Sequence, residues 1–405
     1  MTDTTTTEQW IPCEEDSSGH SFGSEELALV AEVLRSGVLI SSASGFTRRL
    51  ELDFAERYGV SDAIACSSGT TAVQAALAVL DLPPGSEVIT TPLTDIGGVS
   101  PILQEGFVAV FADVDPLTGN IDPDSVELAL SPRTSAIIVT HLVGKPCDMT
   151  RLAEIAERNG LKIIEDCAQA YDAKHAGQYV GTFGSVGCFS TQQTKHISAG
   201  EGGLMLTDDP VIALRLRSWI NKGVAGVVRS RSADHPILGM NARMSEVQAA
   251  IAVAQLRKLT GFVEARVSMA ESLTAALAGL DGVVCPTNGT VEVQTYWKYL
   301  LSIDPVAHPG LRDRIAEELY ARHAVVSPCY LHVPLFEKSL FSHYSRRLVG
   351  EEAPTTRDPQ RDDTLNFPGM RSFIDRAIVF WWNERMTPDD VERIASLVRD
   401  AVLAD

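Results

Sequence analysis

Short apolar runs alternate with helix-like segments between residues 63 and 207, and this rhythm constrains the fold more than any other feature of the sequence. Segments such as Thr71–Leu80 and Thr150–Arg158 have the helix-like pattern. Strands that alternate with helices favour an α/β fold, in which helices cover both faces of a mostly parallel sheet. The apolar runs predict seven strands, at Ala63–Cys66, Glu87–Thr90, Val108–Phe111, Ala136–Thr140, Leu161–Glu165, Gly187–Ser190 and Gly203–Thr207.

The alternation stops after about residue 260. The later elements are predicted to be a helix, a strand region and two further helices, at Phe262–Leu280, Thr295–Leu300, Leu311–Arg322 and Pro388–Leu403. This mixture indicates a smaller α+β domain. Within it, the stretch His343–Leu365 is rich in Arg, Glu, Pro and Thr and predicts a long loop.

The length of the chain suits two domains of unequal size. Its 405 residues, of which 45% are apolar, can bury a large core. We therefore expect an N-terminal arm over 1–20, a large α/β domain over 21–260 and a small C-terminal α+β domain over 261–405.

The composition argues against several classes of protein. A formal net charge of -19 repels nucleic acids and anionic membranes, so neither is expected as a partner. No run reaches the roughly 18 apolar residues of a membrane span, and the start lacks a basic segment followed by an apolar one, so we expect a cytoplasmic protein. The seven cysteines are scattered without CxxC spacing, so neither a metal site nor a disulfide framework is expected.

Polar residues stand at the ends of several predicted strands. In sheets of this kind, ligands bind outside the carboxyl ends of the strands. The polar positions are therefore expected to meet at one edge of the sheet, and they are Ser68-Gly69-Thr70, Thr94-Asp95, His141, Asp166, Ser190 and Lys195.

Lys195 and Asp166 indicate the chemistry of this edge. Lys195 lies on a short loop between a strand that ends at Ser190 and the turn Gly200–Gly203. A lysine amine can form an imine with pyridoxal phosphate, and a carboxylate can keep the pyridine nitrogen protonated so that the ring withdraws electrons. A surface lysine and an aspartate helix cap are the ordinary alternatives. The pairing at the ends of neighbouring elements favours the cofactor.

Ser68-Gly69-Thr70 precedes a predicted helix and suits a phosphate group. The first amides of a helix lack partners within the helix, and the dipole is positive there. Ser190 can give a hydroxyl to the same phosphate, although a strand-end serine that bonds its own backbone is an equal alternative. We expect His141 to be a satisfied interior histidine behind the site.

Five ordered stretches cover nearly the whole chain and carry a resemblance to known proteins. They are SGVLISSASGFTRRLELDFAERYGV, CSSGTTAVQAAL, EDCAQAYDA, GTFGSVGCFSTQQTKHISAGEGG and LGMNARMSEVQAAIAVAQLRKL. Together they resemble the DegT-type (DegT/DnrJ/StrS) sugar and aminocyclitol aminotransferases. The resemblance implies the aspartate aminotransferase fold (type I) and an enzyme that depends on pyridoxal 5'-phosphate.

The resemblance also implies a role for each matching residue. Lys195 would carry the cofactor as an internal aldimine, Asp166 would pair with the pyridine nitrogen, and Gln169 would reach the phenolic oxygen. The implied phosphate-binding residues are Gly69, Thr70 and Ser190, beside Ser68. Asn241 would reach the phosphate of the neighbouring subunit, so that an active homodimer shares its active sites.

The implied activity is transfer of an amino group from glutamate or glutamine to a ketone on a cyclitol or keto sugar, in secondary metabolism. The sequence Gln192-Gln193-Thr194-Lys195 is similar to the corresponding motif of family members that act on free cyclitols or unattached keto sugars. A nucleotide-linked keto sugar is the main alternative, and Arg346, Arg347 and Arg357 are candidates to meet its diphosphate.

Some positions depart from the family pattern. Asp95 follows Thr94, where relatives usually place an aromatic residue that stacks on the pyridine ring. We place Asp95 among the cofactor-site residues and expect that it contacts the substrate or that another side chain covers the ring. Tyr171-Asp172 and Phe380-Trp381-Trp382-Asn383 are further departures, which concern the substrate rather than the chemistry.

Two other classes of function remain open from the sequence. A lyase or dehydratase on the same fold is one, but the histidine that replaces the lysine in such relatives is absent here. A sensor that binds the cofactor without catalysis is the other. The intact set of Lys195, Asp166, Gln169 and Ser190 argues against it, because binding alone does not need the electron-withdrawing arrangement.

Overall fold

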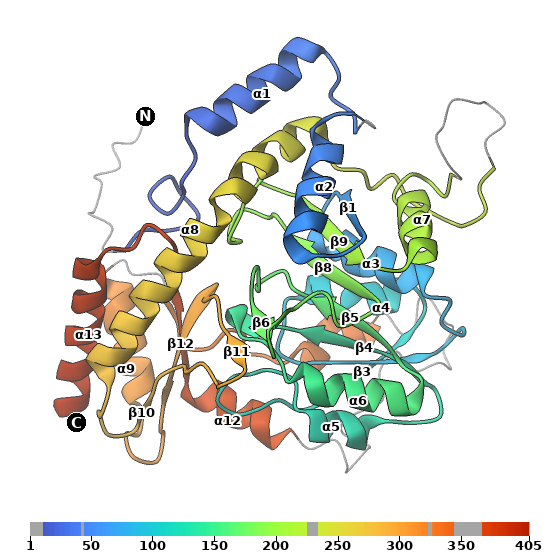
Figure 1. Ribbon diagram of the computed structural model, residues 1–405. Coiled ribbons are helices and arrows are strands. Elements are labelled where there is room, and N and C mark those ends of the chain that lie inside the picture. Colours follow the sequence, from blue (N-terminus) through green and yellow to red (C-terminus); the bar gives the residue numbers. More distant parts are fainter. Residues whose placement is uncertain (1–10, 42–43, 225–233, 323–325, 344–366, 405) are drawn as a thin grey trace.

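The computed structural model describes residues 11–41, 44–224, 234–322, 326–343 and 367–404. Its centre is a seven-stranded sheet in the order β1-β9-β8-β5-β4-β2-β3 (Figure 1). In that order the strands are Asp62–Cys66, Gly203–Thr207, Val186–Ser190, Lys162–Asp166, Thr134–Thr140, Glu87–Thr90 and Val108–Phe111. Only β9 runs against its neighbours in this sheet, and the other six strands are parallel. The predicted α/β fold with a mostly parallel seven-stranded sheet is confirmed.

Helices cover both faces of this sheet. Alternate residues of a strand point to opposite faces. Ile64 of β1 therefore packs in a core with helix α3, whereas Ala63 packs in a second core with α2 and α8. The helices that accompany the sheet are α1 (Ser24–Ser36), α2 (Phe46–Tyr58), α3 (Gly69–Val79), α4 (Ser100–Gln104), α5 (Pro123–Ala129), α6 (Met149–Asn159) and α7 (Pro210–Trp219), with 3-10 turns η1 (Ile96–Gly98) and η2 (Leu142–Gly144).

Helix α8 (Glu246–Leu277) connects the two parts of the molecule and begins earlier than the sequence indicated. The predicted start, Phe262, was wrong because Ser245 caps the helix through its side chain and a capping box with Gln248. The first half of α8 is buried on most sides, so its apolar residues show no single stripe. The expected domain border at 260 falls inside this helix, and the domain limits stay predictions.

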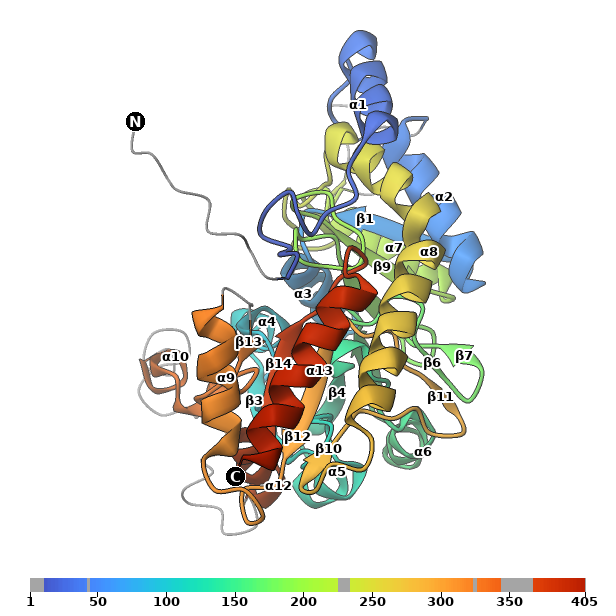
Figure 2. The ribbon, with the colours of Figure 1, turned by 90° about the vertical axis from the view of Figure 1, so that its left-hand side faces the viewer.

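The C-terminal part is built on a second, antiparallel sheet in the order β10-β12-β14-β13. Figure 2 shows α9 and α13 beside this sheet, with the C-terminal half of α8 next to α13. The strands are Val283–Val284, Lys298–Ile303, Ala377–Trp381 and Val326–Ser327, and the helices are α9 (Leu311–Ala321), α10 (Ser339–His343), α12 (Pro368–Arg376) and α13 (Pro388–Leu403), with the turn η3 (Leu335–Glu337).

A small third sheet, β11-β6-β7, joins the two parts, because β11 (Glu292–Val293) pairs with β6 (Lys174–His175), which pairs with β7 (Gln178–Tyr179). The predicted long loop lies outside the described residues from 344 onward, together with Arg346, Arg347 and Arg357.

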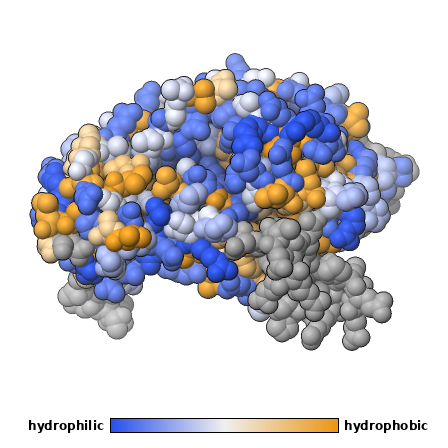
Figure 3. Space-filling model, turned by 90° about the horizontal axis from the view of Figure 1, so that it is seen from below, coloured by the Kyte–Doolittle hydropathy of each residue, from blue (hydrophilic) through white to orange (hydrophobic). Residues whose placement is uncertain are grey.

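The surface is polar on the side of α5 and α12, where hydrophilic residues predominate and apolar ones form small groups (Figure 3). Among the described helices, none combines the length and the apolar character that crossing a membrane requires. The net charge of -19 accords with such a surface.

Candidate active site

A cavity of about 360 Å³ opens at the carboxyl edge of the central sheet. Its walls come from the turns after β1, β2, β5 and β8, from the loop before β9, and from two aromatic residues of the C-terminal part, Trp297 and Tyr330. The candidate residues that line it are Ser68, Gly69, Thr70, Asp95, Asp166, Gln169, Ser190 and Lys195. The topology thus brings together residues that are more than 120 positions apart in the sequence.

The helix α3 begins at this cavity. Ser68 is its N-cap and accepts a hydrogen bond from the amide of Thr71 at 3.1 Å, so its hydroxyl stabilises the helix end. A Cβ atom at Gly69 would lie 2.8 Å from the Cβ of Ser190. Only glycine therefore allows the helix start and the end of β8 to approach so closely. The first turn of α3 offers amides to an anion in the cavity.

Lys195 lies on the loop between β8 and β9, and its side chain is partly exposed in the cavity. Its Nζ atom lies 4.1 Å from the centre of the Trp297 ring. Burial lowers the pKa of the Lys195 amine to about 8, while the Asp166 carboxylate acts in the opposite direction and the Lys298 cation adds to the lowering. At neutral pH more of this amine is therefore neutral than in an ordinary lysine, and the neutral form can act as a nucleophile or base.

Asp166 is the last residue of β5 and is 8% exposed. Burial raises the pKa of its carboxyl group, and a hydrogen bond from the amide of Ala168 at 3.1 Å opposes that rise. A Cβ atom at Gly98 would lie 2.8 Å from Asp166 Oδ2 and 3.6 Å from Thr94 Oγ1. Within the described part of the chain, this buried Thr94 hydroxyl has no hydrogen-bond partner. The Thr94 hydroxyl is therefore available to form a hydrogen bond with a polar group that binds next to Gly98.

Gln169 is fixed by two hydrogen bonds. Its Oε1 accepts from the amide of Val143 at 2.8 Å, and its Nε2 donates to the hydroxyl of Tyr330 at 2.9 Å. The amide nitrogen therefore belongs to the side of Gln169 that lines the cavity, and it has a second N–H to donate. A donor at this place suits a phenolic oxygen.

Asp95 lines the cavity and is exposed. Its Oδ1 accepts from the amide of Gly97 at 2.7 Å and caps the turn η1. A Cβ atom at Gly97 would lie 2.3 Å from Thr70 Oγ1, so the backbone of this turn packs directly against the start of α3. The position that usually holds an aromatic residue thus holds a carboxylate that organises its own turn.

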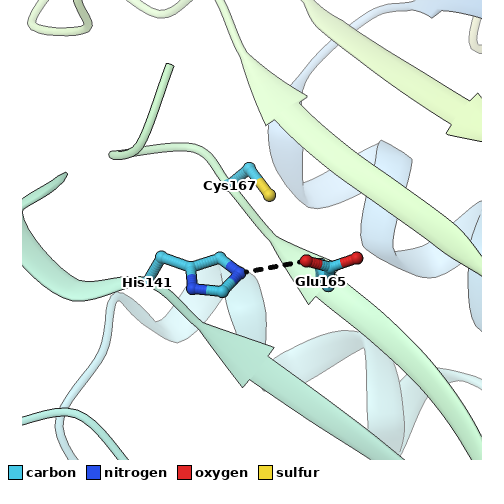
Figure 4. Close-up of side chains that lie close together, drawn as sticks. All are labelled: His141, Glu165 and Cys167. Carbon is cyan, nitrogen blue, oxygen red and sulfur yellow. Dashed lines mark hydrogen bonds and ion pairs between the residues drawn. The ribbon is translucent and has the colours of Figure 1, made fainter. Parts of the chain in front are cut away.

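His141 lies behind the cavity, beside Glu165 and Cys167 (Figure 4). The amide of Cys147 donates to His141 Nδ1 at 3.1 Å, so Nε2 carries the proton and donates to Glu165 Oε2 at 3.2 Å. Glu165 accepts three further hydrogen bonds, from the amides of Gly181, Phe183 and Gly184. Both nitrogens of this fully buried histidine are therefore used within the protein, as expected, and the cluster fixes the ends of β4 and β5.

Asn241 does not line the cavity of its own chain. It is exposed, and its backbone forms a β-bridge with Asn221. Its expected contact with a second subunit stays a prediction.

Trp297 and Tyr330 were missed from the sequence. Trp297 lies just before β12, and Tyr330 follows β13. Nothing in the local pattern around either residue indicated a site, because each reaches the cavity through the packing of the C-terminal part on the sheet edge.

Comparison with known proteins decides the family. The profile of the DegT/DnrJ/EryC1/StrS aminotransferase family matches residues 20–399. The chain belongs to this family. The family named from the motifs is thereby confirmed, and with it the enzyme class, a pyridoxal phosphate-dependent aminotransferase of fold type I.

Individual relatives agree with this membership. The chain is 34% identical over 352 residues to L-glutamine:2-deoxy-scyllo-inosose aminotransferase of Streptomyces kanamyceticus, which covers 83% of this chain and 82% of that protein. It is 33% identical over 323 residues to UDP-N-acetyl-3-dehydro-alpha-D-glucosamine 3-aminotransferase of Acidithiobacillus ferrooxidans, with coverages of 80% and 84%. The crystal structure of the aminotransferase TlmJ from Streptoalloteichus hindustanus superposes with a TM-score of 0.82 at 29% identity, over 95% of this chain and 98% of that one. Such relatives support amino transfer to a sugar or cyclitol.

Proposed function

We propose that the cavity binds pyridoxal 5'-phosphate, which Lys195 holds covalently. The observation that carries this proposal is the arrangement of Lys195 and Asp166 in one cavity of about 360 Å³ that also contains the start of α3. The residues fit the cofactor, because α3 begins in the cavity, where the first amides of a helix suit a phosphate, and the unpartnered Thr94 hydroxyl and the Asp166 carboxylate both border Gly98.

Each residue then has a definite task. Asp166 would hold the ring nitrogen, Gln169 the phenolic oxygen, and Gly69, Thr70 and Ser190 the phosphate. When bound, the cofactor supplies a protonated ring that withdraws electrons from the carbon of the substrate.

Lys195 acts as the base of the reaction. Its amine removes the α-proton of the amino donor and later delivers a proton to the carbon that receives the amine. The amine must be neutral to accept a proton, and its pKa of about 8 provides a neutral fraction near pH 7. Glutamine or glutamate is the proposed donor, in line with the L-glutamine in the name of the Streptomyces kanamyceticus relative.

The charges of the cavity favour an uncharged acceptor. Among the described residues that line it, Lys195 is the only lysine or arginine, whereas Asp95, Asp166 and Glu201 are carboxylates. The phosphate of the cofactor adds further negative charge. A free keto-cyclitol or keto sugar, whose hydroxyls can donate hydrogen bonds to Asp95 and Glu201, is therefore the proposed acceptor rather than a substrate that carries a diphosphate.

A nucleotide-linked keto sugar is the second candidate. The name of the Acidithiobacillus ferrooxidans relative contains such a substrate. Its diphosphate would need cations from outside the described lining, since that lining provides only Lys195.

A homodimer completes the proposal, with Asn241 reaching the cofactor phosphate of the neighbouring subunit. Exposed apolar residues gather near it: Met240 precedes it, and Ile40, 71% exposed, bridges to Ser245. Leu39 and Leu238 are exposed in the same region, and covering them with a second copy removes apolar surface from water.

The experiment that tests the proposal has two stages. First, the purified protein is loaded with pyridoxal phosphate and mixed with glutamine or glutamate, and we expect its absorbance to change to that of the pyridoxamine form. Second, that form is offered free keto-cyclitols, free keto sugars and nucleotide-linked keto sugars. Recovery of the original absorbance with free acceptors supports the proposed class, recovery only with nucleotide-linked ones selects the second candidate, and no change in the first stage overturns the activity.

A further inference from the structure

Trp297 is locked to the loop that carries Lys195. Its indole Nε1 donates a hydrogen bond to the carbonyl of Thr194 at 2.6 Å, which is the residue directly before the lysine. The tryptophan is 5% exposed, and its backbone packs closely on the turn η2, where a Cβ atom at Gly144 would lie 2.8 Å from the Trp297 nitrogen. The ring therefore has a fixed place relative to the backbone of Lys195.

The amine of Lys195 lies over this ring. The distance of 4.1 Å between Nζ and the ring centre is well within the roughly 6 Å over which an ammonium group is attracted to an indole face. The same ring attracts Lys298, whose Nζ lies 4.8 Å from its centre.

Lys298 is itself held in place by a buried ionic network. It pairs with Glu14, which also pairs with Arg266 at 2.9 Å, and Arg266 pairs with Glu384 at 2.9 Å. The ring of Trp381 lies 4.2 Å from Lys298 Nζ. The four charged residues come from distant parts of the chain, and they fix the structure behind Trp297.

We propose that Trp297 is a positioning residue for Lys195, whose ring holds the amine in the cavity whenever it is not bonded to the cofactor. The inference rests on the proposed function, in which this amine is released and bonded again during each turnover. A flexible four-carbon side chain without such a support samples many rotamers, and only some of them bring the amine to the cofactor. The Trp297 ring, fixed by its hydrogen bond to Thr194, limits the rotamers that the Lys195 side chain samples.

The test is the rate at which apoprotein captures pyridoxal phosphate on the lysine, followed by absorbance after rapid mixing. Trp297→Leu keeps an apolar side chain but removes the ring face and the N–H group, and we expect capture about 10-fold slower, because the unsupported lysine side chain then samples rotamers that do not bring the amine to the cofactor. Trp297→Phe keeps a ring face without the hydrogen bond, and we expect an intermediate rate. In turnover assays, kcat should fall with little change in KM for the amino donor.

Trp381→Leu is the matched control, because the ring of Trp381 contacts Lys298 and the residue is not part of the cavity lining. We expect it to capture the cofactor at the wild-type rate. Circular dichroism and the thermal midpoint establish that each variant is folded, and Trp297→Phe serves as the test if Trp297→Leu is not. Equal capture rates for wild type and the folded Trp297 variants overturn the inference, as does equal slowing by Trp381→Leu. If the wild-type protein binds no cofactor on a lysine, the proposed function fails instead.

Discussion

Gln169 donates a hydrogen bond to the hydroxyl of Tyr330 at 2.9 Å across 161 positions of sequence. The bond joins the turn after β5 to the segment after β13, and both residues line the cavity. The C-terminal part thus orients a side chain that the central sheet supplies.

Replacing Tyr330 with Phe removes this acceptor and leaves the Gln169 side chain held only by the amide of Val143. We expect pyridoxal phosphate to bind about 2- to 10-fold more weakly, which is the usual effect of one neutral hydrogen bond. Equilibrium titration of apoprotein with the cofactor measures the change. An unchanged dissociation constant would show that Gln169 is held sufficiently by the amide of Val143.

Asp166→Asn should keep the shape of the site but remove the negative charge. We expect the variant to bind the cofactor and to lose about 100-fold or more in kcat, because an uncharged amide does not keep the ring nitrogen protonated. Steady-state kinetics with an acceptor that restores the absorbance in the two-stage experiment provides the measurement. Asp95→Asn is the comparison: its Oδ1 caps a turn and it lies in the proposed acceptor site, so we expect it to raise KM for the acceptor more than it lowers kcat. A loss of kcat similar to that of Asp166→Asn would contradict the separate roles of the two residues.

Gly98→Ala places a methyl group against the Asp166 carboxylate. The added Cβ atom would lie 2.8 Å from Asp166 Oδ2, so the carboxylate or the turn must shift, at a cost of about 1–3 kcal/mol. We expect both cofactor affinity and kcat to fall. Gly261→Ala is the matched control in helix α8: its Cβ atom would meet nothing within 4 Å, and we expect it to stabilise the protein by about 0.5–1 kcal/mol without loss of activity. Equal activity of the two variants would refute the tight packing at Gly98.

The pH dependence of turnover should follow Lys195. The base must be neutral, so kcat should rise with pH through the pKa of about 8. The charged groups that influence the pKa of this amine are Asp166, Lys298, Asp95 and Glu14.

Lys298→Met removes the cation among these groups. Without this cation the ammonium form of Lys195 is no longer repelled, so the pKa of Lys195 should rise. We therefore expect the rising limb of the kcat profile to move to higher pH. The change also leaves the buried Glu14 with one partner fewer, so a lower thermal midpoint should accompany it. Lys298→Arg should restore the position of the limb, and a limb that stays in place for Lys298→Met would contradict the electrostatic role.

Much of the fold could be predicted because local signals agreed with the tertiary structure. Helix α13 spans Pro388–Leu403, as expected, since Thr387 caps it and a proline occupies its first position. The convergence of Lys195 and Asp166 followed from parallel strands that end at the same edge.

Other features depend on contacts that no local pattern contains. The start of α8 was missed because burial on most sides hides the helical stripe. Trp297 and Tyr330 were missed because they reach the cavity from the C-terminal part, more than 100 positions after Lys195. From the sequence, Asp95 was seen to stand where relatives usually place a ring-stacking aromatic residue. Only the structure shows that its carboxylate caps η1.

The covalent link between pyridoxal phosphate and Lys195 can be tested directly. The loaded protein is reduced with borohydride, digested, and its peptides are sequenced by mass spectrometry. We expect the mass of the reduced cofactor on Lys195 alone. A label on another lysine, or no label on any peptide of a protein that has bound the cofactor, would contradict the assignment of the site.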